Sequence, residues 1–150
     1  VLKGLVKNIN VVFINIHEAK TLFGFSGDPE EVVVRLKKSF GSEIVILSKG
    51  VEGCVAVYKD RIYQGKIYPV TEINRFGVGD AFNAGFIYGF LTGDIEKGLD
   101  YGSAMAALKL TLPHVNYPLI TQREIEVLIS QQILPREDNN LRRMSHRVIR

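Results

Sequence analysis

Hydrophobic and polar positions along the chain change character near residue 70. Before that point, short apolar runs of strand length alternate with segments in which apolar residues recur at helical spacing. Beyond it, the apolar residues recur mainly at helical spacing. Strands that alternate with helices, followed by helices that pack together, predict an α/β layered domain.

Continuous apolar runs predict the strands, and the run at 43–47 has the composition of a buried parallel strand. Lys59 and Asp60 predict a tight hairpin between two of these strands. The expected strands and extended segments are 10–14, 43–47, 54–58, 61–64 and 66–70.

Caps set the limits of the predicted helices, because Asp and Thr accept hydrogen bonds at helix starts whereas Gly and Pro end helices. The expected helices are a helix-like segment at 1–7, one ending near Gly24, one from Asp28 to Gly41, one over 83–91, one from Asp94 to Pro113 and one from Thr121 to about Gln132. The side chains expected on one face of helix 83–91 and its first turn are Phe82, Phe86, Phe90 and Leu91. Gly85 and Gly89 lie four residues apart, which should let a second helix approach closely.

The composition is that of one compact globular domain, with 150 residues of which 46% are hydrophobic. Cys54 is the single cysteine, which excludes an internal disulfide, and the three histidines are too scattered to indicate a zinc site. No apolar run approaches the roughly 20 residues of a membrane span. We therefore expect a soluble, cytoplasmic protein with no membrane partner.

The net charge of +3 is concentrated at the C-terminus, where residues 136–150 hold five arginines and two acidic residues. The first 135 residues are balanced, with 14 basic and 14 acidic side chains. A neutral body predicts no nucleic-acid-binding surface, which would need a basic patch on the folded face. Residues 133–150 are expected to form a flexible basic tail.

The segment Gly77-Val78-Gly79-Asp80 precedes the helix-like run at 83–91 and is the strongest candidate for chemistry. Two glycines let the backbone turn tightly, and the first turn of a helix leaves N–H groups unpaired. Together with the helix dipole, these donors suit phosphate oxygens. Asp80 would repel such an anion, so it either caps the helix or does chemistry on a neighbouring hydroxyl.

Two further patterns follow predicted strands. Asn15 and Glu18 open the helix after the first strand, and Ser48, Gly50 and Gly53 form the turn after the second. Taken alone, the first pattern is equally a helix start with an exposed glutamate, and the second is a plain turn.

The order of these motifs, with an alanine-rich helix behind them, resembles the C-terminal half of the ribokinase-like (PfkB) carbohydrate kinases over roughly residues 1–132. Segments 75–82 and 103–109 are most similar to 2-keto-3-deoxygluconate kinases. The resemblance implies a ribokinase-like layered fold, of which this chain is the C-terminal nucleotide-binding portion. It also implies transfer of the γ-phosphate of ATP to a hydroxyl of a sugar or sugar acid such as 2-keto-3-deoxygluconate.

The resemblance assigns a role to each motif. Asp80 becomes the general base, and the N–H groups of Gly77, Val78 and Gly79 form the anion hole for the γ-phosphate. A methyl group at Gly79 should crowd that anion and strain the backbone. Residues implied in nucleotide binding are Ser48, Gly50, Gly53, Gly102 and Ser103. Residues implied in placing Mg²⁺ through its water shell are Asn15 and Glu18.

The chain departs from the family pattern at two positions and in its length, and these departures limit what the resemblance implies about its activity. Asn74 stands where the family usually has an aspartate, often near a monovalent cation, so potassium activation is not assumed. Ser103 replaces an asparagine common in ribokinases. The chain has about half the family's usual length and starts without methionine, so we expect a fragment that is inactive by itself and a homo-oligomer at full length.

Two other functions remain open. A non-catalytic nucleotide-binding or assembly protein is favoured by Asn74 and disfavoured by the intact Gly77 to Asp80 segment. A dinucleotide-binding oxidoreductase would need Gly-x-Gly-x-x-Gly, and the sixth position here is Phe82.

Overall fold

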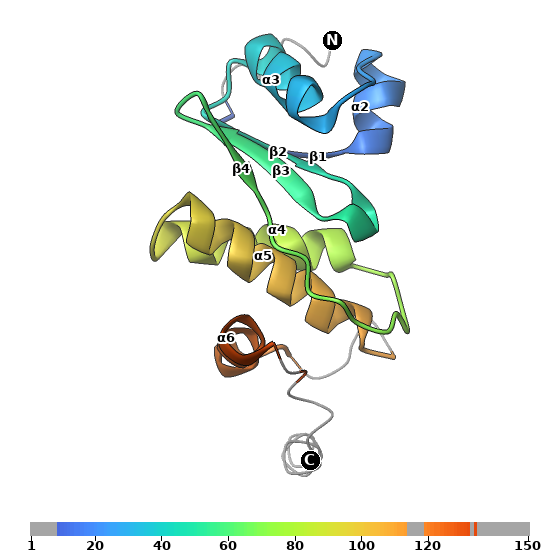
Figure 1. Ribbon diagram of the computed structural model, residues 1–150, viewed down its shortest axis with the longest axis vertical. Helices are drawn as coiled ribbons and strands as arrows, with labels where there is room; N and C mark the ends of the chain where they lie inside the picture. The colour runs from blue at the N-terminus through green and yellow to red at the C-terminus, as the bar shows by residue number, and fades with distance from the viewer. Residues whose placement is uncertain (1–8, 114–118, 133, 135–150) are drawn as a thin grey trace. The chain divides into compact units, whose positions relative to one another are not determined.

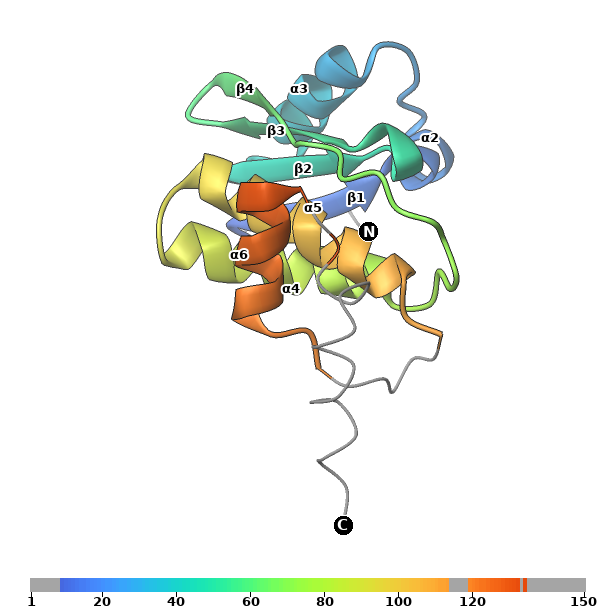
Figure 2. The ribbon, with the colours of Figure 1, turned by 60° about the horizontal axis from the view of Figure 1, so that its bottom comes forward.

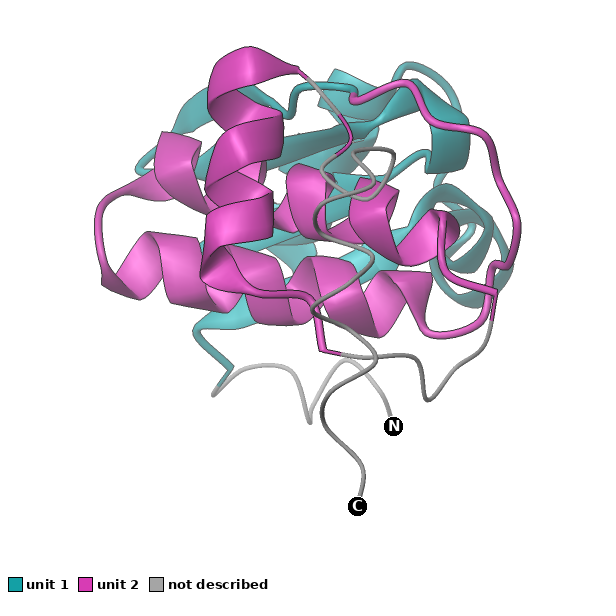
Figure 3. Cartoon of the chain, turned by 90° about the horizontal axis from the view of Figure 1, so that it is seen from below, with its two compact units in different colours: residues 1–67 teal, residues 68–150 magenta. Residues whose placement is uncertain are grey.

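The computed structural model describes residues 9–113, 119–132 and 134. The chain divides into two compact units, Val1–Ile67 and Tyr68–Arg150 (Figure 3). The segment expected to be helical at 1–7, the loop at 114–118 and the expected basic tail, apart from Leu134, lie outside the described residues.

The first unit contains a four-stranded sheet in the order β1-β2-β3-β4 (Figure 1). Its strands are β1 (Val11–Asn15), β2 (Ile44–Ser48), β3 (Cys54–Tyr58) and β4 (Arg61–Gln64). β1 and β2 are parallel, whereas the β2–β3 and β3–β4 pairs are antiparallel. The register places Asn15 opposite Ser48, at the carboxyl ends of the two parallel strands.

Two helices connect β1 to β2, as parallel strands require. α2 (Ile16–Phe23) begins after Asn15 and ends at Gly24, which has a left-handed φ of 68°. α3 (Pro29–Phe40) begins after Asp28, whose Oδ1 accepts from the Glu30 N–H at 2.9 Å. The caps predicted from the sequence are therefore confirmed.

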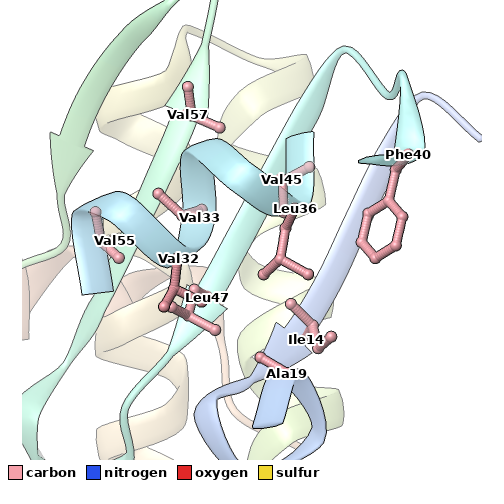
Figure 4. Packing of buried hydrophobic residues seen from close by; sticks show 10 residues of the cluster. All are labelled: Ile14, Ala19, Val32, Val33, Leu36, Phe40, Val45, Leu47, Val55 and Val57. Atoms are coloured by element: carbon pink, nitrogen blue, oxygen red, sulfur yellow. The ribbon is translucent and has the colours of Figure 1, made fainter. Parts of the chain in front are cut away.

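The core of this unit lies between α3 and one face of the sheet (Figure 4). Side chains from α3 meet alternate residues of β2 and β3, because successive strand residues point to opposite faces. The cluster comprises Ile14, Ala19, Val32, Val33, Leu36, Phe40, Val45, Leu47, Val55 and Val57. Burying a valine or leucine side chain fully contributes about 1.5–3 kcal/mol, so this cluster holds the strands in register.

The β3–β4 hairpin turns at Lys59 and Asp60, which have φ values of 48° and 58°. Positive φ at both central residues matches the twist of a two-residue hairpin, as predicted. β4 ends at Gln64, so the extended segment predicted at 66–70 lies outside the sheet. Pro69 has no N–H to donate to a neighbouring strand, which disfavours pairing at that position.

In its described residues, the second unit contains three helices (Figure 2). They are α4 (Val78–Leu91), α5 (Ile95–Leu110) and α6 (Gln122–Gln131). Asp94 caps α5 by accepting from the Lys97 N–H at 2.9 Å. Thr121 and Glu124 form the predicted capping box of α6.

α4 and α5 pack with their backbones nearly in contact. A Cβ atom built on Gly85 would lie 2.6 Å from the Tyr101 carbonyl oxygen, and one on Gly89 would lie 2.5 Å from that of Lys97. The predicted close approach at these glycines is confirmed.

Leu91, expected on the same face of α4 as Phe86, is 76% exposed, because a five-residue separation turns it about 140° around the helix.

α6 packs against α5 around Tyr101, whose hydroxyl donates to Glu126 Oε1 at 3.0 Å. Burial, followed by this hydrogen bond, raises the pKa of Tyr101 to about 12. The phenol therefore remains a donor at neutral pH and joins the two helices.

Candidate functional site

The turn that opens α4 is set by Gly77, which is the N-cap residue with a left-handed φ of 74°. No side chain of a described residue makes a capping hydrogen bond at this helix start. Asp80 is the third residue of the helix and is exposed in its first turn. Capping, one of two roles left open for Asp80 by the isolated motif, is therefore wrong.

The helix start leaves backbone donors available. The Val78 N–H reaches the Arg75 carbonyl at 3.4 Å, and the Ala81 N–H donates to the Gly77 carbonyl at 2.9 Å. Among the described residues, no acceptor meets the N–H groups of Gly77, Gly79 and Asp80. The N–H groups available to an external anion are therefore those of Gly77, Gly79 and Asp80. The Val78 N–H, expected in the anion hole, is instead directed at the Arg75 carbonyl.

Gly79 differs from Gly77 in its backbone. It is not among the glycines with positive φ, and a Cβ built on it meets no atom of the described part of the chain within 4 Å. The expected backbone strain at this position is therefore wrong, since a helical φ accepts alanine. Any effect of a methyl group at Gly79 must come from what binds beside it.

The residues before Gly77 are tied to the end of α5. The N–H groups of Ile73 and Asn74 both donate to the Leu110 carbonyl, at 2.8 and 3.1 Å. The Asn74 side chain adds a bond to the Pro113 carbonyl at 3.2 Å. The position of the turn therefore depends on α5 as well as on its own sequence.

An ion pair joins Arg75 to Glu72 on the surface of this segment. The hydrogen bond from Arg75 lowers the pKa of Glu72. Both side chains are well exposed, so solvent screens the pair and its contribution to stability is small.

In the first unit, Asn15 and Glu18 form a reciprocal cap of α2. Asn15 Oδ1 accepts from the Glu18 N–H at 2.8 Å, and Glu18 Oε2 accepts from the Asn15 N–H at 3.0 Å. The other Glu18 oxygen makes no hydrogen bond to a described residue. A single available carboxylate oxygen is enough for a magnesium ion that keeps most of its waters, but it is too few for a site made of protein ligands alone.

The turn after β2 presents bare backbone next to this cap. Gly50 and Gly53 have φ values of 64° and 79°, a region in which side chains are strained. The Lys49 N–H donates to the Gly53 carbonyl at 2.8 Å and closes the turn. Because Ser48 is paired with Asn15, the structure brings the predicted metal and phosphate residues of this unit together at the carboxyl ends of parallel strands, where α/β folds bind ligands.

The two α5 residues expected near adenine have different surroundings. Gly102 is buried, and a Cβ built on it would lie 3.0 Å from the Phe82 carbonyl oxygen. Ser103 is half-buried. Gly102 therefore has a packing role against α4, and the nucleotide role of both residues stays a prediction.

The described residues contain no group of three or more His, Cys, Asp and Glu side chains that could hold a metal ion. In the same part of the chain, no helix is both long and apolar enough to cross a membrane.

Two hollows lie outside the predicted site. One of about 420 Å³ is lined by Val34, Lys37, Lys38, Gly41, Ser42, Val57 and Asp60. One of about 220 Å³ is lined by Ala84, Gly85, Tyr88, Tyr101, Met105, Ile120, Gln122 and Ile125. Neither includes a residue that the sequence assigns to the site.

Comparison with known proteins decides the family. Residues 1–123 match the model of the pfkB family carbohydrate kinases. The chain belongs to the PfkB family. Among its relatives, the 5-dehydro-2-deoxygluconokinase of Bacillus licheniformis is 34% identical over 109 residues, which are 71% of this chain and 34% of that protein. The 2-dehydro-3-deoxygalactonokinase of Haloferax volcanii is 26% identical over 125 residues, or 83% of this chain and 39% of that protein.

The PfkB chain thus spans a little over a third of the length of these two relatives. A fructokinase from Vibrio cholerae O395, solved with fructose, ADP and a calcium ion, superposes with a TM-score of 0.73 at 21% identity. The alignment covers 84% of this chain and 42% of that structure. The fold predicted from the sequence, a portion of the ribokinase-like fold, is confirmed.

Sequence reasoning missed the residues in α5 and just after it that lie against the turn. Lys109 is only 9% exposed, and its Cε lies 3.5 Å from a Cβ built on Gly77. A lysine at an apolar position of an alanine-rich helix was a usable signal. Leu110 and Pro113 gave none, because they contribute through their backbone carbonyls.

Proposed function

We propose that the full-length protein containing this chain is an ATP-dependent kinase that phosphorylates a hydroxyl of a sugar or sugar acid. The observation that carries the proposal is the first turn of α4, where unpaired N–H groups and an exposed Asp80 carboxylate that does not cap the helix occur together. Such a pairing supplies an anion site and a proton acceptor at one place.

In the proposed reaction, the sugar hydroxyl oxygen attacks the γ-phosphorus as its proton passes to Asp80. The bond between the γ-phosphorus and the bridging oxygen breaks, and ADP leaves with that electron pair. The N–H groups of Gly77 and Gly79 hold the charged phosphoryl oxygens. Because these donors are fixed by the helix, they need no reorganisation during transfer.

The nucleotide and metal roles are proposals of the same kind. Ser48, Gly50 and Gly53 would lie under the phosphates of ATP, and Gly102 and Ser103 near its base. Asn15 and Glu18 would hold Mg²⁺ through water, and the ion would neutralise phosphate charge. No monovalent cation is part of this proposal.

A sugar acid such as 2-keto-3-deoxygluconate is the proposed substrate, supported by the two relatives whose names denote kinases of dehydro-deoxy sugar acids. We further propose a cytoplasmic homo-oligomer that binds neither nucleic acid nor membranes. The balanced charge of residues 1–135 supports the first of these exclusions.

ATP turnover with a panel of sugar acids, measured on the full-length protein, tests the function. Sugar-dependent ADP release supports a kinase. Tight ATP binding without release, for every sugar acid and simple sugar tested, would instead support a non-catalytic nucleotide-binding or assembly protein, the alternative that Asn74 favours.

Replacing Gly79 with alanine should lower kcat by about tenfold or more, because the phosphate is displaced from its donors. The melting temperature should stay the same or rise. The added methyl group would meet no described residue within 4 Å, so we expect it to act on a phosphate placed beside the turn. Alanine also stabilises a helix by up to about 1 kcal/mol relative to glycine. Steady-state kinetics and thermal melting check the two parts, and full activity would remove Gly79 from the phosphate site.

The 150 residues expressed alone should bind ATP weakly and transfer no phosphate. They hold Asp80 but span only 34–39% of the two relatives, and we expect residues outside this span to supply the contacts that orient a sugar. Positioning supplies a large part of catalysis in phosphoryl transfer. An assay with ATP, Mg²⁺ and 2-keto-3-deoxygluconate checks this, and sugar-dependent ADP release by this span would show that it holds a whole active site.

A further inference from the structure

Asn74 lies three residues before Gly77 and uses both ends of its side-chain amide. Its Nδ2 donates to the Pro113 carbonyl at 3.2 Å, and its Oδ1 accepts from the Phe76 N–H at 2.9 Å. One bond reaches beyond the end of α5 and the other holds the turn itself. The amide therefore links the residues leading into Gly77 to a segment almost forty positions away.

The chemistry of the two partners fixes the orientation of this amide. A backbone N–H can only donate and a carbonyl oxygen can only accept, so a flipped amide would lose both bonds. Aspartate has two acceptor oxygens and no donor when ionised. It could still accept from Phe76, but it would place a negative oxygen against the Pro113 carbonyl.

Backbone hydrogen bonds also hold the residues that lead into Gly77. Ile73 and Asn74 donate to the Leu110 carbonyl, which fixes the start of the segment to the last turn of α5. The Asn74 side chain is the tie that lies nearer Gly77. Because Asn74 Oδ1 accepts from the Phe76 N–H, a shift of Asn74 moves the residue that immediately precedes Gly77.

We infer that Asn74 is a positioning residue for the proposed phosphate site, and that it requires an amide rather than a carboxylate. The inference rests on the proposed kinase function. The amide N–H itself makes the link to Pro113, so the turn needs no bound cation at this point. With aspartate at position 74, the two facing oxygens would need a cation between them, and K⁺ is suited to carbonyl and carboxylate oxygens.

The test compares Asn74→Asp and Asn74→Ala with the unchanged full-length protein. Asn10→Asp is the charge-matched control, because Asn10 is exposed and its side chain makes no hydrogen bond to a described residue. ATP turnover is measured in potassium chloride and in choline chloride of equal concentration. We expect wild type and Asn10→Asp to be equally active in both salts.

Asn74→Asp should lose about 10- to 100-fold in kcat in choline chloride, because displacement of catalytic donors by about 1 Å costs up to that factor. Its KM for the sugar should change little, and potassium should restore part of kcat. Asn74→Ala should lose kcat without potassium rescue, and its Phe76 amide should exchange with solvent faster than that of Asn74→Asp.

Wild-type kcat for Asn74→Asp in both salts would overturn the inference and leave the kinase proposal standing. The inference would also be overturned if Asn74→Asp and Asn74→Ala lost kcat equally, melted at a lower temperature and did not respond to potassium. That pattern would show a purely structural role for Asn74. If the wild-type protein itself turned over no ATP with any sugar, the proposed function would be overturned, and the positioning role of Asn74 with it.

Discussion

Replacing Asp80 with asparagine should lower kcat by about 100- to 10,000-fold, the usual cost of losing a general base. Nucleotide affinity should stay nearly unchanged, because the unpaired N–H groups at the start of α4 remain. Asp80 is exposed and caps nothing, so its replacement leaves no buried group without a partner. Steady-state kinetics and ATP titration of the full-length protein measure the two effects.

Glu96→Gln is the matched control for this variant. Glu96 is an exposed acid in the first turn of α5, so its loss changes the charge near a helix start as Asp80→Asn does. We expect this control to keep wild-type turnover. Near-normal kcat in Asp80→Asn would show that the carboxylate takes no part in proton transfer.

Gly89→Ala should destabilise the fold by about 2 kcal/mol. The new methyl carbon would lie 2.5 Å from the Lys97 carbonyl oxygen and 2.9 Å from the Gly98 Cα, which are backbone atoms that cannot rotate away. Overpacking of this kind typically costs about 1–3 kcal/mol, and alanine's better helix propensity offsets about 1 kcal/mol at most. The clash should therefore prevail.

Thermal melting measures this effect, and a fall of about 4–8 °C is expected for a domain of this size. Gly79→Ala is the control on the same helix, since its methyl group would meet nothing within 4 Å. Equal melting temperatures for Gly89→Ala and wild type would mean that α4 and α5 can separate slightly without cost.

The sequence allowed prediction of features that depend on local contacts. The caps at Asn15, Asp28, Asp94 and Thr121 each involve residues two or three positions apart, so their pattern is visible in a short stretch. The close helix approach at Gly89 was predictable for a similar reason, because two small residues at helical spacing leave a groove.

Other features depend on which of two possible caps starts a helix, or on hydrogen bonds between distant residues. Neither is visible in one short stretch of sequence. Asp is a favoured cap, yet Gly77 starts α4 three residues before Asp80, because its left-handed backbone fits the turn without a side chain. The bonds from Asn74 to Pro113 and from Ile73 to Leu110 join distant parts of the chain through backbone carbonyls. Such acceptors are present at every residue, so no sequence pattern marks them.

The connectivity of the two units has a consequence for the order of folding. α4 and α5 are joined by Thr92 to Asp94, so their pairing closes a very short loop. β1 pairs with β2 only after α2 and α3 have been traversed, from Val11 to Ile44. Because contacts close in sequence form faster than distant ones, the helix pair should assemble before the parallel strands meet. A complete chain that refolds from the unfolded state would then form the α4–α5 pair, which the Gly77 turn begins, while Asn15 and Ser48 are still apart.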